Sequence, residues 1–66
     1  MKNRLKVMRA ENNMTQDGLA KEMEVSRQTI NSIETGKYTP STLLSLKIAR
    51  FFKVPLEEIF FLEKED

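Results

Sequence analysis

The hydrophobic and polar positions between Thr15 and Gly36 predict two short helices joined by a tight turn. Small or apolar residues recur where two such helices must touch, namely at Ala20, Val25, Ile30 and Ile33. Polar residues occupy the positions at which the second helix faces outward. This pattern is typical of a helix-turn-helix motif.

Residues at the helix ends support this prediction. Thr15 and Ser26 are preferred N-cap residues, because their hydroxyls accept a hydrogen bond from a free backbone N–H of the first turn. Gly36 ends the second helix, since glycine adopts the left-handed conformation of the C′ position without strain. Only Glu24 and Val25 separate the first helix from the cap of the second. So short a connector forces the two helices to cross steeply.

The second helix has an apolar and a polar face when it is drawn at 100° per residue. Ile30 and Ile33 lie about 60° apart and define the buried side. The other positions carry amides, hydroxyls and one arginine, at Arg27, Gln28, Thr29, Asn31, Ser32 and Thr35. Such groups read the edges of bases, Gln or Asn on adenine and Arg on guanine. The face therefore predicts a helix that reads DNA, with an ordinary polar surface as the alternative.

Motifs across nearly the whole chain carry a resemblance to a known family. They are Leu5-Lys6-x-Met8-Arg9, Met14-Thr15-Gln16, Leu19-Ala20, Val25-Ser26-Arg27-Gln28-Thr29-Ile30, Ile33-Glu34-x-Gly36, Pro40-Ser41, Lys47-Ile48-Ala49 and Leu56-Glu57-Glu58-Ile59-Phe60. From about Leu5 to Phe60 the chain resembles the Cro/CI-type (XRE) helix-turn-helix transcriptional regulators of prokaryotes and phages. The resemblance implies an all-α, lambda-repressor-like domain of five helices. It places the helix-turn-helix at 16–35 and the recognition helix at 27–35.

The resemblance also implies roles for particular residues. Gln16 matches a residue that binds a backbone phosphate and can brace the following helix. The positions that usually touch base edges are Arg27, Gln28 and Ser32. Lys37 and Tyr38 match a loop that lies along the phosphate backbone. Arg9 and Glu34 match a pair that often forms a salt bridge under the recognition helix.

Two residues depart from the family pattern. Glu24 stands at the turn position where Gly is commonest, so we expect a non-glycine residue at positive φ, at a cost of about 1 kcal/mol. Gly18 stands where Glu would complete a capping box with Thr15. We expect only modest local stability from these changes.

The remaining helices are predicted at about Asn3 to Asn12, from Thr39 or Pro40 to about Phe52, and from Val54-Pro55 to about Phe60 or Phe61. The fourth helix and the end of the chain, about 44–66, carry more apolar surface than one core needs. We therefore predict a twofold homodimer whose interface includes Leu44, Ile48, Phe51, Phe60, Phe61 and Leu62. A short β-strand at Phe60–Leu62 is one way to build it, and a monomer with exposed apolar residues is the alternative.

Composition restricts the other possibilities. The chain has 66 residues, which suits one small domain over 1–66, and it contains no Cys and no His. A thiol metal site is therefore excluded and the commonest catalytic base is missing, so we expect no enzyme activity, cofactor or metal. No apolar run is long enough to span a bilayer and no signal peptide precedes the domain. We expect a cytoplasmic protein.

The net charge of +1 hides a separation of charge. Residues 1–56 hold ten Lys or Arg and five acids, a net charge of +5, whereas residues 57–66 hold one Lys and five acids, a net charge of −4. This distribution suits a body that meets phosphate and an acidic end that points away from it.

The sequence therefore predicts sequence-specific binding to duplex DNA by a repressor. A homodimer would place two recognition helices about 34 Å apart on a pseudo-palindromic operator. The alternative is a protein-interaction module, such as an antitoxin, that uses the same fold chiefly to hold a partner protein.

Overall fold

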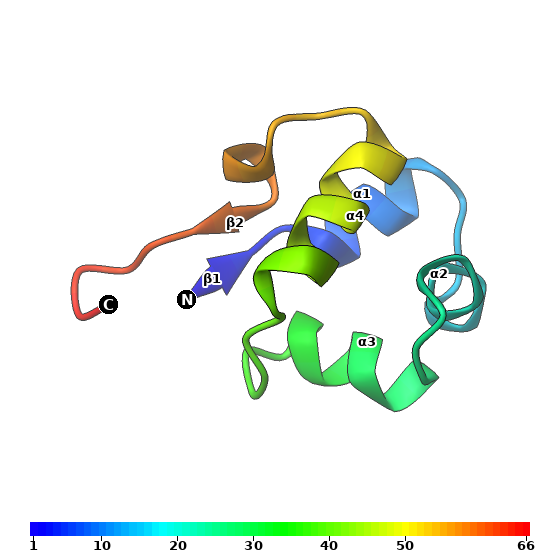
Figure 1. Ribbon diagram of the computed structural model, residues 1–66, viewed down its shortest axis with the longest axis horizontal. Helices are drawn as coiled ribbons and strands as arrows, with labels where there is room; N and C mark the ends of the chain where they lie inside the picture. Colours follow the sequence, from blue (N-terminus) through cyan, green and yellow to red (C-terminus); the bar gives the residue numbers. More distant parts are fainter.

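The computed structural model describes all 66 residues and is mainly helical (Figure 1). Its elements are β1 (Lys2–Asn3), α1 (Leu5–Glu11), α2 (Gln16–Met23), α3 (Arg27–Glu34), α4 (Thr42–Phe52), the 3₁₀ turn η1 (Leu56–Glu58) and β2 (Phe60–Phe61). The predicted helical fold with a short C-terminal strand is confirmed. The expected fifth helix is only the three-residue η1, because the chain extends at Phe60 to pair with β1. None of the helices combines the length and the hydrophobicity that crossing a bilayer requires.

The N-caps of the central helices lie where the sequence predicts them. Thr15 Oγ1 accepts a hydrogen bond from the N–H of Gly18 (2.9 Å), and Ser26 Oγ accepts one from the N–H of Thr29 (3.1 Å). Each hydroxyl satisfies one of the free donors in the first turn of its helix. These caps fix where α2 and α3 begin.

The first and fourth helices begin later than predicted. Ser41, rather than Thr39 or Pro40, caps α4, and its Oγ accepts a hydrogen bond from the N–H of Leu44 (3.1 Å). Asn3, the expected start of the first helix, belongs to β1 instead. Its Oδ1 accepts from the N–H of Leu5 (3.1 Å) and its Nδ2 donates to the carbonyl of Ile33 (2.8 Å). The Asn3 side chain thus joins the start of α1 to the end of α3.

A left-handed residue follows every α-helix within two positions, at Asn13 (φ 54°), Glu24 (φ 59°), Gly36 (φ 78°) and Lys53 (φ 58°). At the end of α2 the N–H of Glu24 donates to the carbonyl of Lys21 (3.2 Å), and the N–H of Val25 donates to that of Ala20 (3.0 Å). This pair of hydrogen bonds is a Schellman motif. The prediction that Glu24 has positive φ is confirmed.

Replacing Glu24 with Gly should stabilise the chain by about 1 kcal/mol, because glycine removes the steric cost of the left-handed conformation. In a domain of this size the melting temperature should rise by about 4–8 °C. Thermal unfolding followed by circular dichroism measures the change. Glu22→Gly, within α2, is the matched control and should instead destabilise by about 1 kcal/mol. If both variants lowered the melting temperature, the backbone at Glu24 would not be strained.

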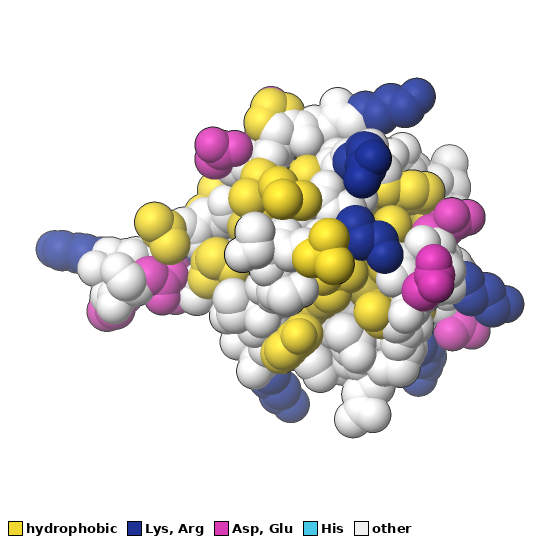
Figure 2. Space-filling model, viewed as in Figure 1, with side chains coloured by type: hydrophobic (Ala, Val, Ile, Leu, Met, Phe, Trp, Pro, Cys, Tyr) yellow, Lys and Arg dark blue, Asp and Glu magenta, His cyan; other side chains and the backbone are white.

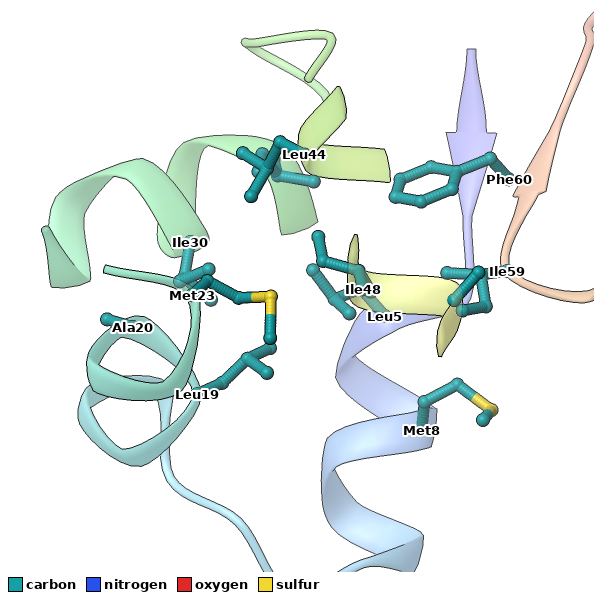
Figure 3. Packing of buried hydrophobic residues seen from close by; sticks show 12 residues of the cluster. Leu5, Met8, Leu19, Ala20, Met23, Ile30, Leu44, Ile48, Ile59 and Phe60 are labelled. Atoms are coloured by element: carbon teal, nitrogen blue, oxygen red, sulfur yellow. The ribbon is translucent and has the colours of Figure 1, made fainter. Parts of the chain in front are cut away.

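One cluster of twelve buried hydrophobic residues joins all four helices to the C-terminal segment. Leu5, Leu19, Ile30, Ile48 and Ile59 are completely buried. Figure 3 shows these and neighbouring side chains converging between the helices. The core therefore fixes α3 against the rest of the chain.

The location of Leu44, Ile48 and Phe60 corrects the predicted dimer interface. These residues are 8%, 0% and 7% exposed and belong to the core of a single chain. The face of α4 that contains Leu44 and Ile48 packs on the other helices, so it is not a surplus outer stripe. The large hydrophobic residues that remain exposed on α4 and the chain end are Leu43, Leu46, Phe51, Phe61 and Leu62.

The two ends of the chain lie side by side. β1 and β2 pair in antiparallel fashion, with Lys2 opposite Phe61 and Asn3 opposite Phe60. The predicted C-terminal strand thus has a partner within its own chain, at the side of the molecule remote from α2 (Figure 1).

Candidate nucleic-acid interface

The packing of α2 on α3 leaves one face of α3 open. Ile30 and Ile33 are at most 1% exposed, and Ala20 of α2 is 2% exposed. Val25 of the connector packs against the same core. The inner face of α3 is therefore held rigidly, and its outer face carries polar side chains.

The outer face presents three long or amide-bearing side chains. Arg27, Gln28 and Asn31 are exposed, whereas Ser32 is half-buried. Thr29 is also half-buried, and its hydroxyl lies 2.9 Å from Ser26 Oγ. Thr29 is therefore part of the cap of α3 and contributes less to the outer face than the sequence suggests.

The loop after α3 lies against the same face. The N–H groups of Lys37 and Tyr38 both donate to the carbonyl of Ser32, at 2.9 and 3.1 Å, because Gly36 turns the chain back at φ 78°. A shallow pocket lies on one side of α3, with Tyr38 at its edge. Its other lining residues are Ser26, Gln28, Thr29 and Ser32. The exposed Lys37 and Tyr38 therefore lie beside the residues predicted to read bases.

An ion pair lies under α3. Arg9 Nε donates to Glu34 Oε2 (2.6 Å) and Arg9 Nη2 donates to Glu34 Oε1 (3.1 Å). Arg9 Nη1 also donates to the carbonyl of Met14 (2.8 Å). Only 14% of the Arg9 side chain and 4% of the Glu34 side chain are exposed. Burial raises the pKa of Glu34, but hydrogen bonds from Arg9 and Gln16 outweigh it and hold that pKa below 4.5.

Gln16 connects this ion pair to the outer face. Its Nε2 donates to Glu34 Oε1 (3.0 Å) and to Asn31 Oδ1 (3.1 Å). Sequence reasoning gave Gln16 a bracing role but missed both of these partners. Glu34 lies about 40° from Ile30 around the helix, close to the buried face. This position is the sequence signal that its carboxylate needs polar partners, of which Gln16 from α2 is one.

Comparison with known proteins also identifies a helix-turn-helix domain. A helix-turn-helix family profile matches residues 5–59. The chain belongs to the helix-turn-helix family of the Cro/CI (XRE) type. It is 56% identical to an uncharacterized HTH-type transcriptional regulator of Methanocaldococcus jannaschii, over the whole of both chains. It is 48% identical to one of Archaeoglobus fulgidus, covering all of this chain and 93% of that one. It is 44% identical to the regulator YgzD of Bacillus subtilis, over the whole of both chains.

Charge around the helix-turn-helix is unevenly distributed (Figure 2). Acidic side chains appear at the left end, beside η1 and around α2, whereas the charged side chains visible along the lower edge formed by α3 are basic.

The amino group of Met1 lies 3.3 Å from Glu63 Oε2 and 3.3 Å from Asp66 Oδ2. These contacts hold part of the acidic tail beside β1.

Proposed function

We propose that this helix-turn-helix chain binds double-stranded DNA in a sequence-specific manner and regulates transcription, with α3 in the major groove. The outer face of α3 carries the proposal, because Arg27, Gln28 and Asn31 extend from a helix whose inner face is fixed in the core. Family membership and the names of the relatives support a transcriptional regulator, which is a binding protein rather than an enzyme.

Contacts to base edges and contacts to phosphate have different consequences for DNA binding. Arg27, Gln28, Asn31 and Ser32 supply sequence preference through base edges. Lys37 and Tyr38 contact phosphate, which fixes the position of the protein and makes affinity fall as salt is added. The basic lower edge in Figure 2 suits this arrangement.

Substitutions should separate the two kinds of contact. Arg27→Ala or Gln28→Ala should reduce the preference for one base pair by about 5- to 150-fold, since a good bidentate contact is worth about 1–3 kcal/mol. Lys37→Ala should weaken binding to all duplexes alike and reduce the salt slope by about 1. Fluorescence anisotropy with duplexes substituted at single base pairs measures both effects. If neither Arg27→Ala nor Gln28→Ala changed sequence preference, the assignment of α3 as the recognition helix would be wrong.

The proposed function itself is tested with two duplexes near physiological salt. One comes from upstream of the gene for this chain, and the other has the same composition in scrambled order. Specific regulators prefer their site by about 10³-fold or more. A preference of that size supports a regulator of its own gene. A chain that binds both duplexes weakly and equally, and that enriches no sequence from a random duplex library, is not a sequence-specific reader.

We further propose that the chain forms a twofold homodimer through α4 and the C-terminal segment. Hydrophobic side chains gather over α4 in Figure 2, interrupted by basic groups. Leu43 is 70% exposed, Leu46 51% and Leu62 81%, with Phe51 and Phe61 at 36%. So much exposed apolar surface on one small chain is typical of an interface.

Sedimentation at micromolar concentrations tests the dimer. The wild type should sediment at twice the 7.7 kDa mass of the chain, and Leu46→Asp should sediment as a single chain, because a buried unpaired carboxylate opposes association. Val7→Asp is the matched control, since Val7 is 44% exposed on α1, and it should remain dimeric. A wild type that sediments as a monomer overturns the homodimer.

We propose that the dimer is a cytoplasmic repressor, and its twofold symmetry would suit a pseudo-palindromic operator, with the recognition helices about 34 Å apart. The exposed apolar residues of α4 equally favour the second candidate function, an antitoxin-like module that binds another protein. A monomeric wild type would favour that module, whereas a dimer that binds its own upstream duplex and lowers transcription of a reporter gene favours the repressor.

A further inference from the structure

The exposed face of α4 combines apolar and basic side chains. It consists of Leu43, Leu46, Lys47 and Arg50, of which the two leucines are 70% and 51% exposed. These positions have the spacing i, i+3, i+4 and i+7, so they lie within about 100° of each other on one side of the helix. No acidic residue lies on α4, and neither of its basic groups forms an ion pair within the chain.

The C-terminal segment, residues 57–66, has the opposite charge and exposed apolar groups of its own. It contains five acids and one Lys. Glu57 and Glu58 are exposed and form no ion pair within the chain. Leu62 is 81% exposed and Phe61 is 36% exposed. The segment is therefore complementary to the exposed face of α4, with acids for its basic groups and apolar side chains for its leucines.

The structure holds the C-terminal segment apart from the exposed face of α4 in the same chain. Ile59 and Phe60 are buried in the core, and Phe61 is paired with Lys2 of β1. Beyond β2 the chain runs away from α4 (Figure 1). Within one chain the two complementary surfaces therefore stay apart, and both remain open to another molecule.

Charge distinguishes two ways of bringing two copies together. If the exposed faces of two α4 helices met, Lys47 and Arg50 of each copy would face the same basic residues of the other, and like charges across an interface are disfavoured. If α4 of one copy meets the C-terminal segment of the other, basic groups face acids and leucines face Phe61 and Leu62. A twofold axis then repeats this contact, so that both copies use both surfaces. Figure 2 shows acidic side chains beside η1 and at the left end on the same side of the molecule as the apolar and basic groups over α4, which suits such an axis.

We propose that the exposed face of α4 docks the acidic C-terminal segment of a second copy of this chain, and that the exchange is reciprocal. The inference rests on the proposed function, because it specifies the contacts of the homodimer proposed there. It gives the separation of charge, +5 in residues 1–56 and −4 in residues 57–66, a role in assembly as well as in the approach to DNA.

Two charge-reversed variants test the proposal. One carries Lys47→Glu with Arg50→Glu on α4, and the other carries Glu57→Lys with Glu58→Lys on η1. In each variant alone the dissociation constant of the dimer should rise by about 100-fold or more, because like charges then face each other in both contacts. An equimolar mixture of the two should form a dimer within about 10-fold of wild-type affinity, because every contact again joins opposite charges. Sedimentation at micromolar concentrations measures each variant and the mixture.

A matched control separates this effect from a general effect of net charge. Lys6→Glu with Lys21→Glu makes the same change of net charge as the α4 variant, at exposed positions of α1 and α2, and should dimerise as wild type does. Recovery of the dimer in the mixture shows in addition that both charge-reversed variants are folded.

Each other outcome overturns a different statement. A mixture that stays monomeric, beside a dimeric wild type, overturns the reciprocal docking but not the homodimer. If the α4 variant binds wild type more tightly than wild type binds itself, α4 faces α4 and the docking is likewise wrong. A monomeric wild type overturns the homodimer, and this inference with it. Sequence-specific DNA binding is measured separately by selection from the random duplex library, so its failure is distinguishable from all of these.

Discussion

Replacing Arg9 with Met is expected to lower the free energy of unfolding by about 3–5 kcal/mol. The variant leaves the Glu34 carboxylate, only 4% exposed, without its main partner. A chain of this size has a total stability of about 3–10 kcal/mol, so the loss is a large part of the whole. The melting temperature at pH 7, followed by circular dichroism, should fall by more than about 10 °C.

A double variant shows whether the uncompensated charge causes this loss. Arg9→Met combined with Glu34→Met replaces both charges by apolar groups of similar length and should recover most of the stability. If the double variant were as unstable as Arg9→Met alone, the loss would come from the packing of Arg9 and from its hydrogen bond to the carbonyl of Met14.

The ion pair also makes stability depend on pH. Because the pKa of Glu34 in the folded chain lies below its ordinary value of 4.5, the stabilisation by this pair is complete above pH 4.5. It is lost as pH falls through the lower folded-state pKa. The difference in unfolding free energy between wild type and Glu34→Gln should therefore shrink as pH is lowered below about 4.5.

Replacing Ile48 with Ala is the second substitution with a large expected effect, a loss of about 2–5 kcal/mol. Ile48 is completely buried among residues from several helices, so the shorter side chain leaves a cavity as well as losing apolar contacts. Denaturation by urea measures the loss from the shift of the midpoint at constant slope.

Leu46→Ala is the matched control on the same helix. Leu46 is 51% exposed, so this substitution should change the unfolding free energy of the monomer by no more than about 0.5 kcal/mol. If Ile48→Ala behaved like Leu46→Ala and only weakened association, Ile48 would belong to an interface between chains and not to the core.

The central part of the fold follows from local signals in the sequence. Thr15 and Ser26 cap α2 and α3 by their own hydroxyls, and Glu24 takes the left-handed turn that the spacing of the two helices demands. The inward placement of Ile30 and Ile33 follows from helical periodicity. These features depend on residues within one or two turns of each other, and sequence reasoning is reliable at that range.

The features that sequence reasoning missed depend on distant parts of the chain. Periodicity identifies the apolar stripe of Leu44 and Ile48, but it does not tell whether that stripe meets the same chain or another one. The pairing of β1 with β2 and the contact between Gln16 and Asn31 likewise join residues far apart in sequence. A pattern of residue types predicts that Asn31 is exposed, but the direction of its amide depends on the carboxylate of Glu34.

The pairing of the chain ends has a kinetic consequence. The N–H of Arg4 donates to the carbonyl of Ile59 (2.8 Å), a contact that closes a loop of about 55 residues. The connector between α2 and α3 closes a far shorter loop, and the difference in closure entropy is of order 1–2 kcal/mol. We therefore expect the strand pair to form after α2 and α3 have packed together, and to open by local unfolding before they separate. Such an opening would uncover Phe60 while α2 and α3 keep their native contacts.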